Sequence, residues 1–403
     1  MIGLSRLVRI RAAVVAIGAA LAVVVAVAPV QADRFGPPWM SVVTANQTTL
    51  YGDKDRTSSI GPLSKGATVV VIGGDSDMTQ TPEGWVASSD VAESTQPWIA
   101  EISDPTATLY ARPNPGDGAI RDANQGDLVR VMGVSLGVDG DSNLWWATTE
   151  GYLGLHSIQS TSNPAAQQWT LPAADDATNG WWGIAKAANV RAAPSADAPV
   201  VGEFSGGEHV KVLSEEQGDE VNGNSTWYRI DGGRFAGAHV HSSLISHAPD
   251  PQPTVMPPDH EVGSDPWIVV DRSASTLTLL QDGAPRFTTY VSLGKAGVET
   301  QDGTYATFIK YRADRMTSTT VPNAEHAYDL PNVPFTQYFL ADGSAIHGTY
   351  WHDEFGTNQS QGCINVTWTD GEYLFSQTKP QIPADQIGFA VDPEQATPVV
   401  VVN

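Results

Sequence analysis

The sequence predicts a mainly β protein, in which three small β-barrels precede a larger β-sandwich-like C-terminal domain with few helices. Two observations lead to this prediction. A pattern of one glycine, two valines and a tryptophan recurs three times in register. The C-terminal part instead contains apolar runs joined by an Asp-Gly turn, and a single convincing helix. With 38 glycines and 27 prolines in 403 residues, turns are expected throughout.

The first segment, residues 1–32, has the features of a signal peptide. Three arginines precede an apolar run that ends in Val30-Gln31-Ala32, which suits cleavage before Asp33. Because the apolar run is slightly long for a signal core, an uncleaved N-terminal anchor stays open as the one expected membrane contact. In both cases the remaining chain is expected to be secreted, periplasmic or associated with the cell wall.

The charge of the chain argues against nucleic acid as a partner. The formal net charge is −23, with 45 acidic and 22 basic residues. No basic stripe that could neutralise phosphates follows the leader. We interpret the acidity as a solvated surface suited to the outside of a cell.

The three repeats share one pattern of β-strand formation. In each copy, valines follow a glycine at three and five positions. A glycine permits a tight turn. The two valines are two residues apart, so both lie on one face of the strand that follows. The three sets are Gly66, Val69 and Val71; Gly126, Val129 and Val131; and Gly207, Val210 and Val212.

These repeats resemble bacterial SH3-like domains. The third, residues 181–247, matches best through its Asn189-Val190-Arg191 opening and its Trp227-Tyr228 strand. The second, residues 97–160, matches moderately, and the first, residues 38–96, is divergent. The resemblance implies binding to cell-wall peptides or a spacer role. We expect the tryptophans to be core residues rather than ligand-stacking residues.

Two linkers separate these units. Residues 161–180 are rich in Ala, Pro, Asp and Asn, and residues 248–264 carry five prolines that favour an extended spacer. The terminal domain then spans residues 265–393.

The terminal domain is expected to begin as an antiparallel meander. Strands are predicted at 267–271, 276–280 and 286–292, with the last two joined by Asp282-Gly283. The one predicted helix begins at a capping box, Thr369-Asp370-Gly371-Glu372.

Neither a metal nor another cofactor is expected. Acidic and amide residues between Asp139 and Glu150 occur at the spacing of a calcium loop, but Leu144 stands where that loop requires glycine. His352, Asp353 and Glu354 fit no zinc-binding spacing.

Cys363 is the only cysteine, and therefore has no intramolecular disulfide partner. It could be an inert side chain, an intermolecular bridge or a working thiol. His347, sixteen residues upstream, favours a working thiol, because an imidazole can accept the thiol proton and return it to a leaving amine.

The segment around Cys363 resembles the L,D-transpeptidase catalytic domain, also called the YkuD domain. That family has a histidine, a spacer, and then Ser/Thr-His-Gly-Cys followed by a hydrophobic residue and Asn or Arg. Gln361 replaces the motif histidine. The residues that match behind His347 are Ser360, Gly362, Cys363, Ile364 and Asn365.

The resemblance implies a cysteine-dependent acyl transfer between peptidoglycan stem peptides. Cys363 would form a thioester with release of D-alanine. A second stem would resolve the thioester to give a 3-3 cross-link, or another amine would resolve it to give a link to that acceptor. His347 would be the proton acceptor and donor, with its ring oriented by the carbonyl of Gly348. Backbone N–H groups around Gly362 and Cys363 would stabilise the oxyanion.

Two other functions stay open. Water could resolve the thioester, which would make the protein an L,D-carboxypeptidase or endopeptidase acting on wall peptides. Alternatively, Gln361 could mark a catalytically silent domain in a wall-binding protein. A papain-like hydrolase is disfavoured, because there the cysteine precedes the histidine in the chain.

Overall fold

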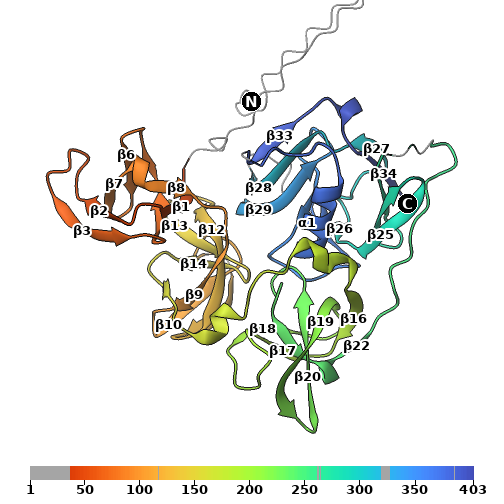
Figure 1. Cartoon of the computed structure of the whole chain (residues 1–403), viewed down its shortest axis with the longest axis horizontal. Coiled ribbons are helices and arrows are strands. Elements are labelled where there is room, and N and C mark those ends of the chain that lie inside the picture. The colour runs from red at the N-terminus through yellow and green to blue at the C-terminus, as the bar shows by residue number, and fades with distance from the viewer. Residues whose placement is uncertain (1–36, 117, 261–262, 264, 319–326, 385) are drawn as a thin grey trace, which may run out of the picture.

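The structure is a computed structural model that describes residues 37–116, 118–260, 263, 265–318, 327–384 and 386–403 (Figure 1). The predicted signal peptide, residues 1–32, lies outside the described residues. Within these ranges no helix has the length and apolar character needed to cross a membrane.

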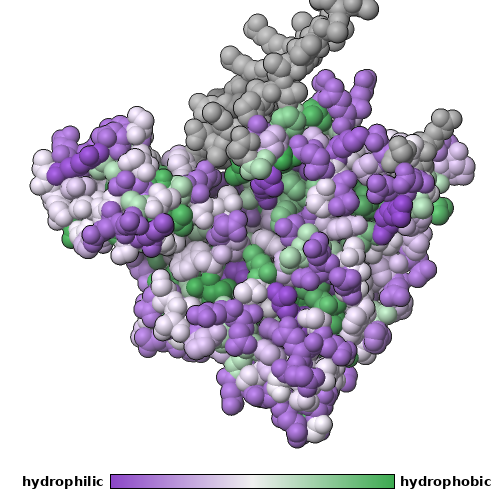
Figure 2. Space-filling model, viewed as in Figure 1, coloured by the Kyte–Doolittle hydropathy of each residue, from purple (hydrophilic) through white to green (hydrophobic). Residues whose placement is uncertain are grey.

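The mainly β fold is confirmed. The described residues form strands throughout, with one α-helix, α1 (Trp368–Gln377). Figure 1 shows the chain as four adjoining modules, three of them before the C-terminal domain. Hydrophilic residues predominate on the face shown in Figure 2. The exact boundaries of the predicted segments stay predictions.

The strands of the three repeats follow one another in chain order. The first repeat contains β1 (Trp39–Val43), β2 (Gln47–Tyr51), β3 (Ser59–Ser64), β4 (Thr68–Val71), β5 (Gly73–Gly74), β6 (Met78–Thr81), β7 (Gly84–Ala87) and β8 (Val91–Glu93). The second contains β9 (Trp98–Ile102), β10 (Thr106–Tyr110), β11 (Ala119–Asn124), β12 (Leu128–Leu136), β13 (Leu144–Thr148), β14 (Tyr152–Gly154) and β15 (Ile158–Ser160). The third contains β16 (Trp181–Ala185), β17 (Ala188–Arg191), β18 (Val200–Phe204), β19 (His209–Val221), β20 (Asn224–Asp231), β21 (His239–His241) and β22 (Ile245–His247).

The strand order shows that the repeats are built alike. The second repeat is one sheet in the order β11-β10-β14-β13-β12-β9-β15, and the third has the equivalent order β18-β17-β21-β20-β19-β16-β22. The first repeat follows the same order but is divided into β3-β2-β7-β6-β5 and β4-β1-β8. The division falls at Ile72, between the two pieces of its central strand.

The shared glycine-valine pattern acts as predicted. Gly66, Gly126 and Gly207 have φ angles of 84°, 92° and 98°, which side-chain-bearing residues rarely adopt. The paired valines that follow are buried in every repeat. The tryptophans are also core residues: Trp145, Trp146 and Trp227 are at most 8% exposed.

The C-terminal domain packs two five-stranded sheets around a shared apolar core. Their orders are β25-β24-β23-β34-β27 and β32-β30-β29-β28-β33, and β26 pairs with β31. The strands are β23 (Trp267–Asp271), β24 (Thr276–Gln281), β25 (Ala284–Tyr290), β26 (Leu293–Gly294), β27 (Gly303–Ala306), β28 (Ile309–Thr317), β29 (Asp329–Tyr338), β30 (Ala345–Gly348), β31 (Asn358–Ser360), β32 (Ile364–Val366), β33 (Gly388–Ala390) and β34 (Pro398–Val402). The predicted turn is present, with positive φ at Asp282 (52°) and Gly283 (73°).

Helix α1 begins earlier than the predicted capping box. Its N-cap is Thr367, whose side chain accepts a hydrogen bond from the N–H of Asp370. The predicted cap, Thr369, instead donates its N–H to the Asp231 carboxylate of the third repeat, at 3.1 Å. The predicted start of the helix was therefore wrong by two residues, because Thr367 caps the first turn and Thr369 lies within it.

The predicted linkers pack against the modules. Two 3-10 helices, Pro164–Gln167 and Ala174–Thr178, occur in the first linker. Its Trp169 is 2% exposed and lies under the guanidinium of Arg130. The described residues of the proline-rich linker form no strand or helix, in agreement with an extended segment.

Candidate active site

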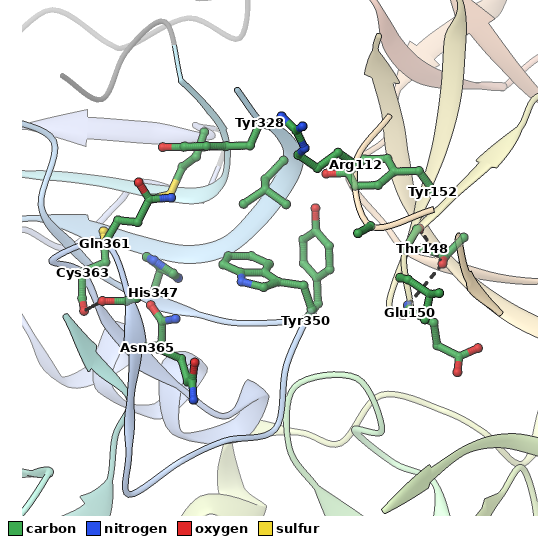
Figure 3. Close-up of a pocket in the computed structure, with 18 of the residues that line it drawn as sticks. Arg112, Thr148, Glu150, Tyr152, Tyr328, His347, Tyr350, Gln361, Cys363 and Asn365 are labelled. Atoms are coloured by element: carbon green, nitrogen blue, oxygen red, sulfur yellow. Dashed lines mark hydrogen bonds between the residues drawn. The ribbon is translucent and has the colours of Figure 1, made fainter. Parts of the chain in front are cut away.

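Strand pairing brings the two predicted catalytic residues together. Strands β30 and β32 are parallel neighbours, with His347 opposite Asn365. Cys363 directly precedes β32, two positions before Asn365, so its side chain falls on the same face as Asn365 and His347. Both Cys363 and His347 line one cavity of about 410 Å³ (Figure 3).

The turn before Cys363 is held by Ser360. The Ser360 hydroxyl donates to the Cys363 carbonyl at 2.6 Å and accepts from the Gly362 N–H at 3.1 Å. Gly362 has a φ of 110°, which explains a glycine there. Ser360 and Gly362 therefore shape the loop that presents the thiol.

His347 is fixed by its own strand. It is 2% exposed, and its Nδ1 lies 3.1 Å from the Gly348 carbonyl oxygen. A proton on Nδ1 makes this hydrogen bond and leaves Nε2 as the basic nitrogen. Helix α1 supports this strand closely, since a Cβ at Gly371 would lie 3.2 Å from the Gly348 Cα.

Asn365 and Gln361 occupy different parts of the site. The Asn365 amide nitrogen lies 2.8 Å from His352 Nε2, and among the described residues no partner reaches its buried Oδ1. Gln361, which replaces the motif histidine, lines the cavity and lies beside Cys363 in Figure 3.

Burial sets the protonation of the candidate pair. Desolvation raises the pKa of Cys363 to about 11 and lowers the pKa of His347 to about 4. At neutral pH the resting site therefore holds a neutral thiol and a neutral imidazole. A neutral imidazole can accept the thiol proton when substrate binds.

The reactivity of Cys363 towards iodoacetamide is therefore expected to rise continuously from pH 6 to pH 10, because the thiolate is the reactive form and its pKa is about 11. The rate measured by mass spectrometry should increase roughly tenfold for each pH unit. A plateau beginning below pH 7 would instead reveal a stable thiolate–imidazolium pair.

A second cavity, of about 260 Å³, also reaches Cys363. It is lined by Gln361 and Gly362, and carries two acidic residues, Glu299 and Asp342. Cys363 thus contributes to two cavities.

The sequence did not predict one wall of the larger cavity. Arg112, Glu150 and Tyr152 come from the second repeat, more than 190 residues before Cys363 in the chain. No local motif marks these residues, because only the packing of two modules places them at the site.

The acidic groups considered as metal ligands bind protein groups instead. Asp353 accepts from the Gly233 N–H at 2.9 Å and from Arg234 Nε at 2.7 Å. Asp141 accepts from the Trp145 ring at 2.8 Å. Within the described part of the chain, His, Cys, Asp and Glu side chains form no group of three or more that could hold a metal ion.

Solved L,D-transpeptidases share limited similarity with this chain. L,D-transpeptidase 3 from Mycobacterium tuberculosis is 22% identical over 35% of this chain and 62% of its own, with a TM-score of 0.29. An L,D-transpeptidase from Mycobacterium smegmatis is 22% identical over 35% and 60%, with a TM-score of 0.28. The catalytic domain of the Enterococcus faecium enzyme is 23% identical over 35% and 98%, with a TM-score of 0.28. The chain thus spans about three fifths of the length of the two mycobacterial structures.

No curated protein matches the chain. Family models match two segments. Residues 186–246 match the bacterial SH3 domain. Residues 265–401 match the L,D-transpeptidase catalytic domain. The C-terminal third of the chain is therefore a YkuD-type L,D-transpeptidase catalytic domain, preceded by a bacterial SH3 domain.

Proposed function

We propose that this protein is a cysteine-dependent L,D-transpeptidase that forms 3-3 cross-links between peptidoglycan stem peptides. The observation that carries the proposal is the placement of His347, on β30, and Cys363, directly before the adjacent strand β32, at one cavity. The family match supports cross-linking of peptidoglycan at the level of the family.

The first half-reaction is acylation of Cys363. As Sγ attacks the carbonyl carbon of the diamino acid of a tetrapeptide stem, the thiol proton passes to His347 Nε2. Breakage of the peptide bond then releases D-alanine, whose amine takes that proton from His347. The products are a thioester and free D-alanine.

The second half-reaction regenerates the thiol. The side-chain amine of another stem attacks the thioester carbonyl and gives a proton to His347. The C–S bond breaks, and the sulfur takes the proton back. The new amide joins two third-position residues.

The oxyanion requires a backbone donor close to Cys363. The Gly362 N–H is already bound to Ser360 Oγ, so we assign the stabilising role to the N–H of Cys363 itself. The Cys363 N–H is one of the two donors expected from the sequence, and Gly362 has the conformational role given by its positive φ.

Transfer is favoured over hydrolysis by the second cavity. Glu299 and Asp342 give that cavity a negative charge, which attracts a cationic amine acceptor. The larger cavity would then hold the acyl donor. Water remains the competing acceptor, and the experiment below separates the two.

We further propose that the protein acts outside the cytoplasmic membrane, secreted or associated with the cell wall. The predicted leader and the substrate both support this location. The bacterial SH3 domain would contribute contacts to the wall.

Mass spectrometry of a purified tetrapeptide muropeptide tests the proposed reaction. Incubation with residues 33–403 should yield a dimer lighter than two substrates by one alanine, and Cys363→Ala should yield none. Tripeptide without dimer would identify hydrolysis. Unchanged substrate with both proteins would point to a wall-binding protein.

A further inference from the structure

The second repeat forms one wall of the cavity at Cys363. Figure 3 shows its side chains on the side opposite His347, Gln361 and Cys363. The lining residues from the second repeat include Ala111, Arg112, Ile120, Thr148, Glu150 and Tyr152.

This wall is anchored firmly to the catalytic domain. The Asp329 carboxylate of β29 accepts from Ser135 Oγ at 2.9 Å, and its backbone carbonyl accepts from the Tyr152 hydroxyl at 2.9 Å. Gly133 lies so close that a Cβ there would be 2.7 Å from the Pro331 Cβ. The second repeat is therefore a fixed part of the site rather than an independent domain joined only by a linker.

The cation in this wall is particular to the second repeat. Tyr51, Tyr110 and Arg191 are equivalent positions in the three repeats. They end β2, β10 and β17, and each pairs with the equivalent strand of its own repeat, β7, β14 or β21. Two residues further along the chain, the first repeat has Asp53, the second Arg112 and the third Ala193. Only the repeat that lines the cavity carries a cation at this position.

We propose that the second repeat is part of the substrate-binding site and that Arg112 binds a carboxylate of the peptide that acylates Cys363. The inference rests on the proposed function, because that function supplies the substrate. Peptidoglycan stem peptides carry free carboxylates, and a guanidinium matches a carboxylate in shape and charge. In a chain with 45 acidic and 22 basic residues, a cation at the cavity wall attracts such a peptide locally.

The surroundings of Arg112 are compatible with this role. Its Nη1 donates to the Asp139 carboxylate at 2.6 Å and to the Ala327 carbonyl at 3.3 Å. The Asp139 side chain is 47% exposed. An ion pair that is this open to water is weak, so Asp139 holds Arg112 only weakly. The acidic residue of the same wall, Glu150, is paired with Arg121, and burial raises its pKa. A substrate carboxylate can therefore displace Asp139 from the guanidinium.

Calorimetric titration of the full chain carrying Cys363→Ala tests the proposal without turnover. The probes are a tetrapeptide stem with free carboxylates and the same peptide with its carboxylates amidated. Arg112→Ala should weaken binding of the free acid about tenfold and change binding of the amidated peptide less than about twofold. The affinity of Arg112→Lys for the free acid should lie between those of Arg112→Ala and the parent. Lysine keeps the charge but cannot form the two parallel hydrogen bonds that a guanidinium makes with a carboxylate.

Arg191→Ala is the matched control. It also removes one cation, but from the third repeat, where Arg191 Nη1 donates to the Ala198 carbonyl at 2.7 Å. This variant should leave both affinities unchanged. Three results would overturn the inference. The Arg112→Ala and parent proteins could bind the free acid equally, Arg112→Ala could lose affinity equally for both peptides, or the parent could bind neither peptide.

Turnover by the wild-type chain separates the two proposals. Dimer formation together with binding that is insensitive to Arg112→Ala would reject the role of Arg112 and leave the enzyme function standing. Binding that depends on Arg112, without any dimer or tripeptide, would support the site and reject the transpeptidase function.

Discussion

Cys363→Ala is expected to lower the rate of D-alanine release from a tetrapeptide stem by ~10⁴-fold or more, because alanine offers no nucleophile. His347→Gln should cause a loss of similar size, since the thiol proton then has no acceptor at neutral pH. The two residues act in one step, so the double variant should be no slower than the slower single variant. Liquid chromatography of released D-alanine measures all three rates.

Thermal denaturation is the control for these variants. His347 is buried, and glutamine retains an amide that can donate towards the Gly348 carbonyl, so the melting temperature should change little. Two results would contradict the assignment: a Cys363→Ala protein within tenfold of the wild type, or a double variant whose loss is the product of the single losses. The second result would mean that the residues contribute independently.

The sequence predicted the parts of this site that lie close together in the chain. The motif around Cys363 predicted that this thiol and His347 form a pair, and the structure adds the parallel strands at which they lie and the positive φ of Gly362. The repeated glycine-valine spacing predicted three turns and three buried strands, because local backbone sterics and period-two burial decide both.

Contacts between modules could not be predicted in the same way. The N-terminal end of helix α1 is bound by Asp231, and one cavity wall contains Arg112. Each residue looks like an ordinary residue of its own repeat. Their positions depend on how whole modules pack, which no periodicity or short motif records.

The third repeat is connected to the candidate catalytic residue His347 through helix α1. Asp231 accepts from the Thr369 N–H and hydroxyl, and the Gly232 carbonyl accepts from the Trp368 N–H at 3.2 Å. The same helix packs against Gly348, whose carbonyl orients His347. Loss of this interface should therefore affect both stability and the position of the base.

A buried cluster of charges holds the interface between the third repeat and helix α1. Lys211 of β19 forms an ion pair with Asp370 of α1, and both side chains are at most 2% exposed. Lys211 Nζ also donates to the Ala177 carbonyl at 2.7 Å, and Asp370 accepts from Thr289 Oγ1 at 2.5 Å. Burial and the nearby Asp370 raise the pKa of Asp231, which Lys211 opposes. One cation therefore compensates two buried carboxylates.

Lys211→Met is expected to destabilise the protein by about 3–5 kcal/mol at pH 7.5, because it leaves Asp231 and Asp370 buried together without their cation. Asp370→Asn should cost less, since Lys211 then still faces Asp231. Lys186→Met, at an exposed lysine of the same repeat, should be close to neutral and serves as the control. Differential scanning calorimetry of the full chain measures the stability of each variant and so gives their order.

Lowering the pH should restore much of the stability lost in Lys211→Met. The pKa of Asp231 is raised from 3.8 to about 6 in the folded protein, so between these values the folded state binds more protons than the unfolded state. Stability contributed by this group therefore increases as the pH falls through that window. Without Lys211 the two carboxylates repel each other more strongly, and the window moves upward. The difference in melting temperature between Lys211→Met and the wild type should shrink between pH 7.5 and pH 5.5. A difference that stays constant would mean that lost packing of the lysine stem, rather than uncompensated charge, causes the destabilisation.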